Sequence, residues 1–138
     1  MLPSRPQGLV LLSPWLDLTN TSPTFLTNAA TDPLFSLASA REAADLYLQG
    51  HSPEHPLASP LFGPLAGFPP TYISIGAEEV LAEDGRRLSE SLRAAGISAE
   101  LHPVRGMEHV AVTRDLALPG SAETFERAAG FIEACLRR

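Results

Sequence analysis

Two segments of the chain carry side chains whose types could move a proton between them. The first, residues 76–84, contains Glu79 and Asp84, and the second, residues 106–110, contains His109. A carboxylate that hydrogen-bonds to an imidazole fixes its tautomer and stabilises the imidazolium formed when the histidine takes a proton from a nucleophile. However, acids in a first helical turn also favour the positive end of the helix dipole, and a loop histidine is commonly a solvated or structural residue. The residue types alone leave both interpretations open.

Three short apolar segments could position these side chains. Residues 8–12 form an unalternating apolar run that ends at Ser13-Pro14, which is typical of a strand covered on both faces. Residues 71–76 are rich in β-branched and aromatic side chains, and residues 98–104 form a third such segment, whose proline suggests a strand end or an edge position. The three segments predict the strands of one sheet.

Helical patterns fill the intervals between and after these strands. Ser39 and Glu42 have the spacing of a capping box, which predicts a helix that starts at Ser39 and ends at Gly50. Leucines at helical spacing predict a second helix over residues 81–95, and an apolar stripe predicts a third that starts at Ser121. From residue 71 onward the order is strand, helix, strand, helix, which predicts parallel strands joined by a right-handed crossover.

The acid-rich segment and the histidine segment each follow a predicted strand. The carboxyl ends of parallel strands meet at one edge of the sheet, and neighbouring strands lie ~4.8 Å apart. Glu79 and His109 are separated by about the length of one strand-helix-strand unit, so an acid on one loop can reach the histidine on the next. Asp84, about one helical turn further on, is the alternative acid.

Several motifs together resemble the hormone-sensitive-lipase-like carboxylesterases of the α/β-hydrolase fold. They are Ser13-Pro14-Trp15-Leu16-Asp17-Leu18-Thr19, Pro56-Leu57-Ala58-Ser59-Pro60-Leu61 with Phe68-Pro69-Pro70-Thr71-Tyr72-Ile73, Gly76-Ala77-Glu78-Glu79-Val80-Leu81, and Gly106-Met107-Glu108-His109. The match extends from about residue 8 to 136 in the family's order and spacing. The resemblance implies an α/β chain: the C-terminal portion of an α/β-hydrolase parallel sheet, about three strands, with flanking helices. Residues 1–138 would be one partial domain, with a loop-rich, cap-like insertion at 15–68 after the first strand and strand-helix-strand-helix at 69–138.

The same resemblance assigns roles to individual residues. His109 falls at the family's general base and Glu79 at its triad acid, where many relatives have Asp-Pro-Leu and this chain has Glu79-Val80-Leu81. Three aromatic residues of the insertion are expected either in the core or lining a substrate site; they are Trp15, Phe25 and Phe35. Asp17 and Asn28 are assigned structural roles only.

The nucleophile of the triad has no candidate in the sequence. In this fold the serine occupies a strand-to-helix turn of form G-x-S-x-G, but residues 63–67 have Leu65 at the serine position, and no His-Gly-Gly run supplies an oxyanion hole. We therefore expect a C-terminal fragment of a serine carboxylic-ester hydrolase, inactive by itself, whose serine and oxyanion hole would precede Met1. Two alternatives stay open. One is a non-catalytic interaction module that self-associates through the edge strand at residues 8–12, and the other is an incomplete gene model.

Composition limits the partners and the compartment. The formal net charge of −6, with scattered Lys and Arg, argues against nucleic acid and anionic membranes. The single cysteine, Cys135, cannot form an intrachain disulfide and is expected in the core. No signal sequence opens the chain, and no apolar run approaches the ~20 residues that span a bilayer, so a cytoplasmic protein is expected.

The remaining histidines do not predict a metal site. His51 and His55 are four positions apart, but the intervening Pro53 excludes a helix, so both are expected to be solvated loop residues. His102 is expected on the surface of its strand. No metal and no organic cofactor are implied, and the expected substrate of the intact enzyme is a small-molecule carboxylic ester with a modest acyl chain.

Overall fold

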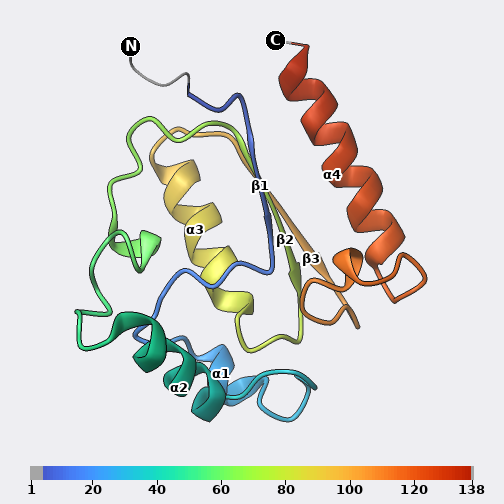
Figure 1. Ribbon diagram of the computed structural model, residues 1–138. Helices are drawn as coiled ribbons and strands as arrows, with labels where there is room; N and C mark the ends of the chain where they lie inside the picture. Colours follow the sequence, from blue (N-terminus) through green and yellow to red (C-terminus); the bar gives the residue numbers. More distant parts are fainter. Residues whose placement is uncertain (1–4, 138) are drawn as a thin grey trace.

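Three parallel strands form the centre of the computed structural model, which describes residues 5–137. The strands are β1 (Leu9–Leu12), β2 (Thr71–Gly76) and β3 (Ala99–Val104), arranged in the order β1-β2-β3 (Figure 1). Leu11 lies opposite Ile73 across the first pair, and Ile73 lies opposite Leu101 across the second. The predicted three-stranded parallel sheet is confirmed, with each strand within one residue of its expected bounds.

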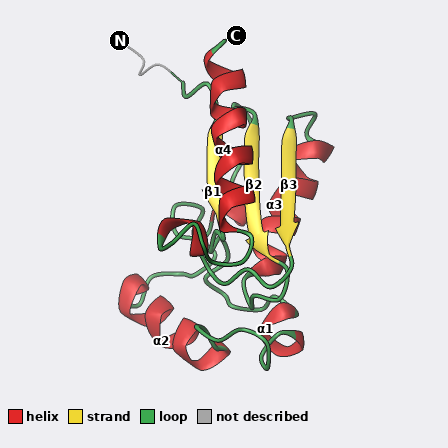
Figure 2. Cartoon of the chain, turned by 90° about the vertical axis from the view of Figure 1, so that its right-hand side faces the viewer, coloured by secondary structure: helices red, strands yellow, loops and turns green. Residues whose placement is uncertain are grey.

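The helices lie on both faces of the sheet and beyond one of its ends. Helix α3 (Ala82–Ala94) covers one face and α4 (Ser121–Leu136) the other, while α1 (Thr24–Thr27) and α2 (Leu37–Leu48) lie beyond the carboxyl ends of the strands (Figures 1 and 2). Two 3₁₀ turns, Pro60–Phe62 and Ala111–Thr113, complete the elements of the described residues. Helices thus cover both faces of the sheet, as is usual for parallel strands.

Helix α2 begins earlier than the capping pattern predicted. Its N-cap is Ser36, whose side chain accepts a hydrogen bond from the Ser39 backbone N–H, and the Ser39 side chain in turn accepts one from the Ser36 N–H. The predicted pairing of Ser39 with Glu42 is therefore wrong. A serine at the third helical position can complete the reciprocal cap that is usually sought with a glutamate or glutamine.

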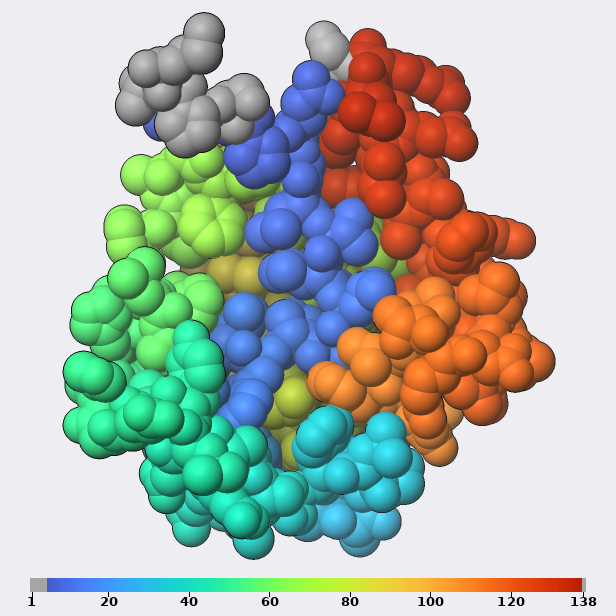
Figure 3. All heavy atoms as spheres, in the orientation of Figure 1, coloured from blue at the N-terminus to red at the C-terminus, as the bar shows by residue number. Residues whose placement is uncertain are grey.

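Strand β1 occupies one edge of the sheet and has a partner on one side only. Figure 3 shows this segment, in blue, uncovered along its length between α4 and the residues around 60–70. A cavity of about 500 Å³ runs between β1 and α4, lined among others by Gly8, Val10, Phe131 and Ile132. The edge that the sequence predicted at residues 8–12 is thus open within the described part of the chain.

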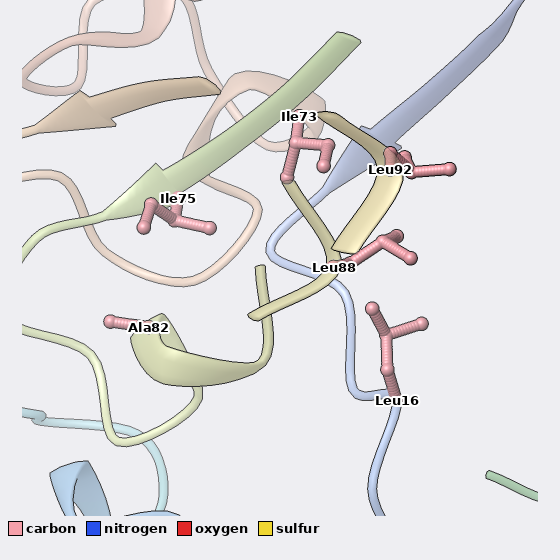
Figure 4. Packing of buried hydrophobic residues seen from close by; sticks show 6 residues of the cluster. All are labelled: Leu16, Ile73, Ile75, Ala82, Leu88 and Leu92. Atoms are coloured by element: carbon pink, nitrogen blue, oxygen red, sulfur yellow. The ribbon is translucent and has the colours of Figure 1, made fainter. Parts of the chain in front are cut away.

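The largest apolar cluster lies between the sheet and α3. Alternate residues of β2, Ile73 and Ile75, form this cluster with Ala82, Leu88 and Leu92 of α3 and with Leu16 (Figure 4). Side chains alternate across a strand, so this face of β2 is apolar while the opposite face carries Tyr72 and Ser74. The cluster holds α3, and with it the acid-rich segment that precedes this helix, against the sheet.

The opposite face of the sheet is more polar, and it contains a residue whose position the sequence did not predict. His102 is 8% exposed, and its Nδ1 lies 2.8 Å from the Tyr72 hydroxyl, so the expected surface position is wrong. The alternation along β3 does place His102 opposite the α3-facing residues, but α4 covers that second face as well. Burial raises the pKa of Tyr72 to about 12.

Helix α4 buries only part of its apolar stripe. Cys135 is buried, as expected, but Phe125 is 54% exposed and Leu136 is 70% exposed. In the described residues no helix is both long and apolar enough to cross a bilayer. The cytoplasmic location expected from the sequence stays a prediction.

Candidate active site

The carboxyl edge of the sheet brings together side chains from three successive strand ends. Ser13 follows β1, Glu79 follows β2 and His109 follows β3. The Nδ1 atom of His109 lies 2.9 Å from Oε1 of Glu79, across 30 positions of the chain. Glu79 is 2% exposed, and the His109 side chain is 19% exposed. The acid is thus buried, while the histidine is partly exposed.

The turn that carries Glu79 depends on the glycine that ends β2. A Cβ atom built on Gly76 would lie 2.1 Å from the backbone oxygen of Met107, so no larger residue fits between the two loops. The Gly76 N–H donates to Oε2 of Glu79, and the Ser13 hydroxyl donates to the same oxygen at 2.7 Å. The chain turns back on itself here, so the carboxylate lies directly over the end of its own strand.

The segment between β1 and β2 supports this turn from the outside. The Asn28 side-chain amide donates to the backbone oxygens of Glu79, at 2.8 Å, and of Ala77, at 3.3 Å. The Asp32 carboxylate accepts from the Val80 N–H at 2.9 Å. These contacts give Asn28 the structural role expected for it, because they hold the backbone of the acid loop in place.

The histidine loop is fixed by contacts on its other side. The Gly106 N–H donates to the Glu78 carboxylate at 2.9 Å, and Val110 adopts a left-handed conformation with φ 45°. The Phe35 ring packs edge-on against the His109 imidazole, with ring centroids 4.7 Å apart. When Nδ1–H donates to Glu79, Nε2 carries the lone pair, and no side chain of residues 5–137 hydrogen-bonds to it. In this tautomer Nε2 can accept a proton.

Asp84, the alternative acid, has other partners. Its Oδ2 accepts from the backbone N–H groups of Leu16, at 2.8 Å, and Asp17, at 3.0 Å, and its Oδ1 accepts from the Ser22 hydroxyl at 2.7 Å. The side chain is buried, and burial raises the pKa of Asp84 above its ordinary value. Asp84 does not contact His109; it holds the chain that follows β1.

Asp17 lies beside this second carboxylate and is ionised more readily. Burial alone would raise its pKa, but hydrogen bonds from Thr19 and Arg87 outweigh burial and lower it. The Arg87 guanidinium lies 2.6 Å from Oδ2 of Asp17, which explains the structural role that the sequence assigned to this aspartate.

An apolar cavity of about 320 Å³ opens beside the imidazole of His109. Its lining comes from the segment between β1 and β2, from the loop that follows β2 and from the histidine itself: Trp15, Phe25, Phe35, Ser39, Ala40, Ala43, Leu81 and His109. Phe25 is fully part of the core, whereas Phe35 is partly exposed. Core packing is thus confirmed for Phe25, while a substrate site lined by these aromatic residues stays a prediction.

Other candidate ligands stay apart. His51 and His55 are exposed in the loop after α2. Among the residues that the structure describes, no three His, Cys, Asp or Glu side chains gather as a metal ion would require.

Sequence reasoning did not single out Ser13, although its hydroxyl contacts Glu79. The two residues are 66 positions apart, and no spacing rule connects a serine after one strand to an acid after another. Its position at the end of a predicted strand, between the strand and a proline, was the only available signal.

Comparisons with known proteins identify the fold family and several relatives. Residues 2–113 match a family model described as alpha/beta hydrolase fold. The chain is 37% identical over 127 residues to an acetyl-hydrolase from Streptomyces hygroscopicus, which covers 92% of this chain and 42% of that protein. It is also 37% identical over 103 residues to an esterase from Acinetobacter venetianus, covering 74% of this chain and 34% of that protein.

Solved structures show the same partial match. One is an esterase from the bacterial hormone-sensitive lipase family, with TM-score 0.88, 38% identity and coverage of 91% of this chain and 42% of that one. Another is EstE5 soaked by ethyl alcohol, with TM-score 0.91, 32% identity and coverage of 96% and 45%. The chain spans less than half the length of each of these relatives.

Proposed function

We propose, since the chain belongs to the alpha/beta hydrolase fold family, that it is the C-terminal part of a serine carboxylic-ester hydrolase. In this proposal Glu79 is the triad acid and His109 the general base. The observation that carries it is the hydrogen bond of 2.9 Å between them at the carboxyl edge of the sheet. The order of acid and histidine along the chain is also the order of this fold.

The chemistry follows from the orientation of the imidazole. With Nδ1–H donated to Glu79, Nε2 takes the proton of a serine hydroxyl as the serine attacks the ester carbonyl. The protonated histidine then gives this proton to the leaving alcohol, and water, activated by the same Nε2, hydrolyses the acyl-enzyme. The serine and the oxyanion donors belong to the part of the fold that the 138 residues do not contain, because the sequence has no G-x-S-x-G.

The substrate class rests on the relatives and on the cavity. One relative is named an acetyl-hydrolase and others esterases, which supports a small-molecule carboxylic ester as substrate. The cavity beside His109 holds about 320 Å³ and is walled by aromatic and aliphatic side chains, which suits an acyl or alkyl group of modest size.

A chimera tests this function. Residues 8–136 replace the matching part of the Streptomyces hygroscopicus acetyl-hydrolase, and hydrolysis of p-nitrophenyl acetate is measured. We expect turnover in the chimera and a decrease in kcat of about 10³–10⁴-fold in Glu79→Gln and His109→Ala, by analogy with other triads. Asp84→Asn is the matched control and should retain kcat. A folded chimera whose kcat is unaffected by Glu79→Gln would contradict the assignment.

The isolated chain provides the complementary measurement. A histidine and an acid without a nucleophile have nothing to activate, so the chain alone should neither hydrolyse the ester nor react with a fluorophosphonate probe. Stoichiometric labelling of a serine in the isolated chain would overturn the proposal.

A second candidate is an interaction module that associates through β1. The open strand edge, the cavity of about 500 Å³ beside it and the exposed apolar residues of α4 favour a partner at this surface. Size-exclusion chromatography of the chain at several concentrations distinguishes the two candidates. Association that increases with concentration supports the module, while a sharp monomer peak with cooperative unfolding counts against it.

A further inference from the structure

We infer that Ser13 is a positioning residue for the acid of this site, holding the Glu79 carboxylate so that one of its oxygens faces His109. This inference rests on the proposed function and assigns a role in it to the residue that follows β1. Ser13 is buried, and its backbone N–H donates to the Ser74 oxygen at 2.7 Å, which extends the pairing of β1 with β2 by one residue. The serine is therefore anchored to the sheet itself.

The hydroxyl of Ser13 acts on one oxygen of the carboxylate. It donates to Oε2 of Glu79 at 2.7 Å, and the Gly76 N–H donates to the same oxygen. Two donors from two different strand ends fix the plane of the carboxylate and satisfy Oε2. Oε1 is then the oxygen that meets Nδ1 of His109 at 2.9 Å.

The same hydroxyl lies beside the histidine loop. The Val110 N–H points at the Ser13 oxygen at 3.4 Å, a longer contact from the residue that follows His109. One buried hydroxyl thus contacts both the acid and the backbone of the loop that carries the base. Ser13 is not placed as the nucleophile, because a nucleophile has to reach Nε2, whereas Ser13 contacts the carboxylate on the Nδ1 side.

The tautomer of His109 reports this role. Neutral histidine in water favours a proton on Nε2, so a proton on Nδ1 requires a well-placed acceptor. If Ser13 positions that acceptor, loss of its hydroxyl releases the carboxylate and lets the proton move to Nε2. A role in stability alone would leave the tautomer of the folded protein unchanged.

The experiment is ¹⁵N NMR of the imidazole nitrogens in the full chain, at a pH above the histidine titration, with His109→Gln to assign the signals. We expect the ratio of Nδ1–H to Nε2–H tautomers to decrease about tenfold in Ser13→Ala, in keeping with the loss of one hydrogen bond to a charged acceptor. Ser13→Gly is the second variant, because φ is 46° at this position and glycine removes the hydroxyl without backbone strain.

A matched control is available in Ser22. It is buried like Ser13, and its hydroxyl donates at 2.7 Å to a buried carboxylate, that of Asp84, which does not contact the histidine. Ser22→Ala should leave the His109 tautomer at its wild-type ratio. A changed ratio in this control would show that the readout follows general loosening and would overturn the inference.

The remaining outcomes separate this inference from the proposed function. A wild-type ratio in folded Ser13→Ala and Ser13→Gly overturns the inference, as does unfolding of both while Ser22→Ala stays folded. Glu79→Gln should invert the tautomer, since Ser13 and Gly76 select the amide oxygen and turn its NH₂ toward Nδ1. An unchanged tautomer ratio in Glu79→Gln would contradict the proposed pairing of Glu79 with His109. If Glu79→Gln changes the ratio and the Ser13 variants do not, the pairing is supported and the role of Ser13 is contradicted.

Discussion

Glu79 and Asp84 belong to the same segment after β2, and both are buried, but their carboxylates have different surroundings. Asp84 receives donors on both oxygens, two backbone N–H groups on one and the Ser22 hydroxyl on the other. Glu79 receives Ser13 and Gly76 on one oxygen and presents the other to His109. The difference lies in the partners, not in residue type or burial.

This contrast separates a carboxylate bound only by fixed donors from one that also contacts an ionisable side chain. A carboxylate whose oxygens are both occupied by fixed backbone and hydroxyl donors can only hold the chain. A carboxylate with one fixed oxygen and one titratable neighbour is positioned and still able to respond to a proton. Removing or replacing each carboxylate tests this distinction.

The largest effect is expected for Asp84→Ala. It leaves the N–H groups of Leu16 and Asp17 and the Ser22 hydroxyl buried without an acceptor, each worth about 1–3 kcal/mol. We expect the free energy of unfolding to decrease by about 4 kcal/mol, measured by urea denaturation. A loss below about 1 kcal/mol would mean that Asp84 does not hold the chain after β1.

A smaller loss is expected for Asn28→Ala, which acts on the Glu79 side of the comparison. The substitution removes both donors to the backbone oxygens of the acid loop, and the free energy of unfolding should fall by about 2 kcal/mol. Hydrogen exchange of the Glu79 and Val80 amides should accelerate. Thr31→Ala is the control, because its contact with the Glu78 oxygen is exposed and its loss should cost about 0.5 kcal/mol or less.

Asp84→Asn should have a still smaller effect, and one that depends on pH. The amide can keep all three hydrogen bonds, with its oxygen facing the two N–H groups and its NH₂ facing Ser22. Burial raises the pKa of Asp84 in the folded protein above the ordinary 3.8, so its contribution to stability is complete below pH 3.8 and is lost as the pH rises through the folded pKa. Asp84→Asn has no ionisable group at this position, so its stability does not decrease in this way as the pH rises.

Urea denaturation across this pH range measures the difference between the two proteins. Asp84→Asn and wild type should unfold within about 1 kcal/mol of each other at the acid end. The free energy of unfolding of the variant should then increase relative to that of wild type as the pH increases. Asp17, whose pKa is lowered, titrates in both proteins, so its contribution largely cancels in the difference. A variant as unstable as Asp84→Ala at neutral pH would show that the charge of Asp84 is required.

The smallest change in stability is expected for Glu79→Gln, within about 1 kcal/mol of wild type, because its oxygen still accepts from Ser13 and Gly76. The distinction between the two acids then appears in function: the amide at position 79 alters the His109 tautomer, and the amide at position 84 does not. Equal tautomer ratios of His109 in Glu79→Gln and Asp84→Asn would contradict the distinction between the two acids.

Local patterns were sufficient for the elements and for the edge where the site lies. The apolar strands and the alternation of strand and helix place residues 76–84 and 106–110 at neighbouring strand ends, because parallel strands share one carboxyl edge. The same patterns misplaced the start of α2 and the environment of His102. The N-cap of α2 is Ser36, which precedes the serine that the pattern indicated. His102 is buried because α4, which follows β3 in the sequence, covers the second face of the sheet.

From its residues alone, the chain determines a three-stranded parallel sheet with an acid and a histidine on adjacent loops, since hydrophobic periodicity and strand order are local properties. Only the tertiary structure shows that Glu79, and not Asp84, contacts His109, and that Ser13 contacts Glu79. Apart from the Gly76 N–H, the donors that orient the two carboxylates come from residues 13–22, more than sixty positions earlier. A carboxylate points where its donors are, and their positions exist only once the chain after β1 has packed over the end of β2.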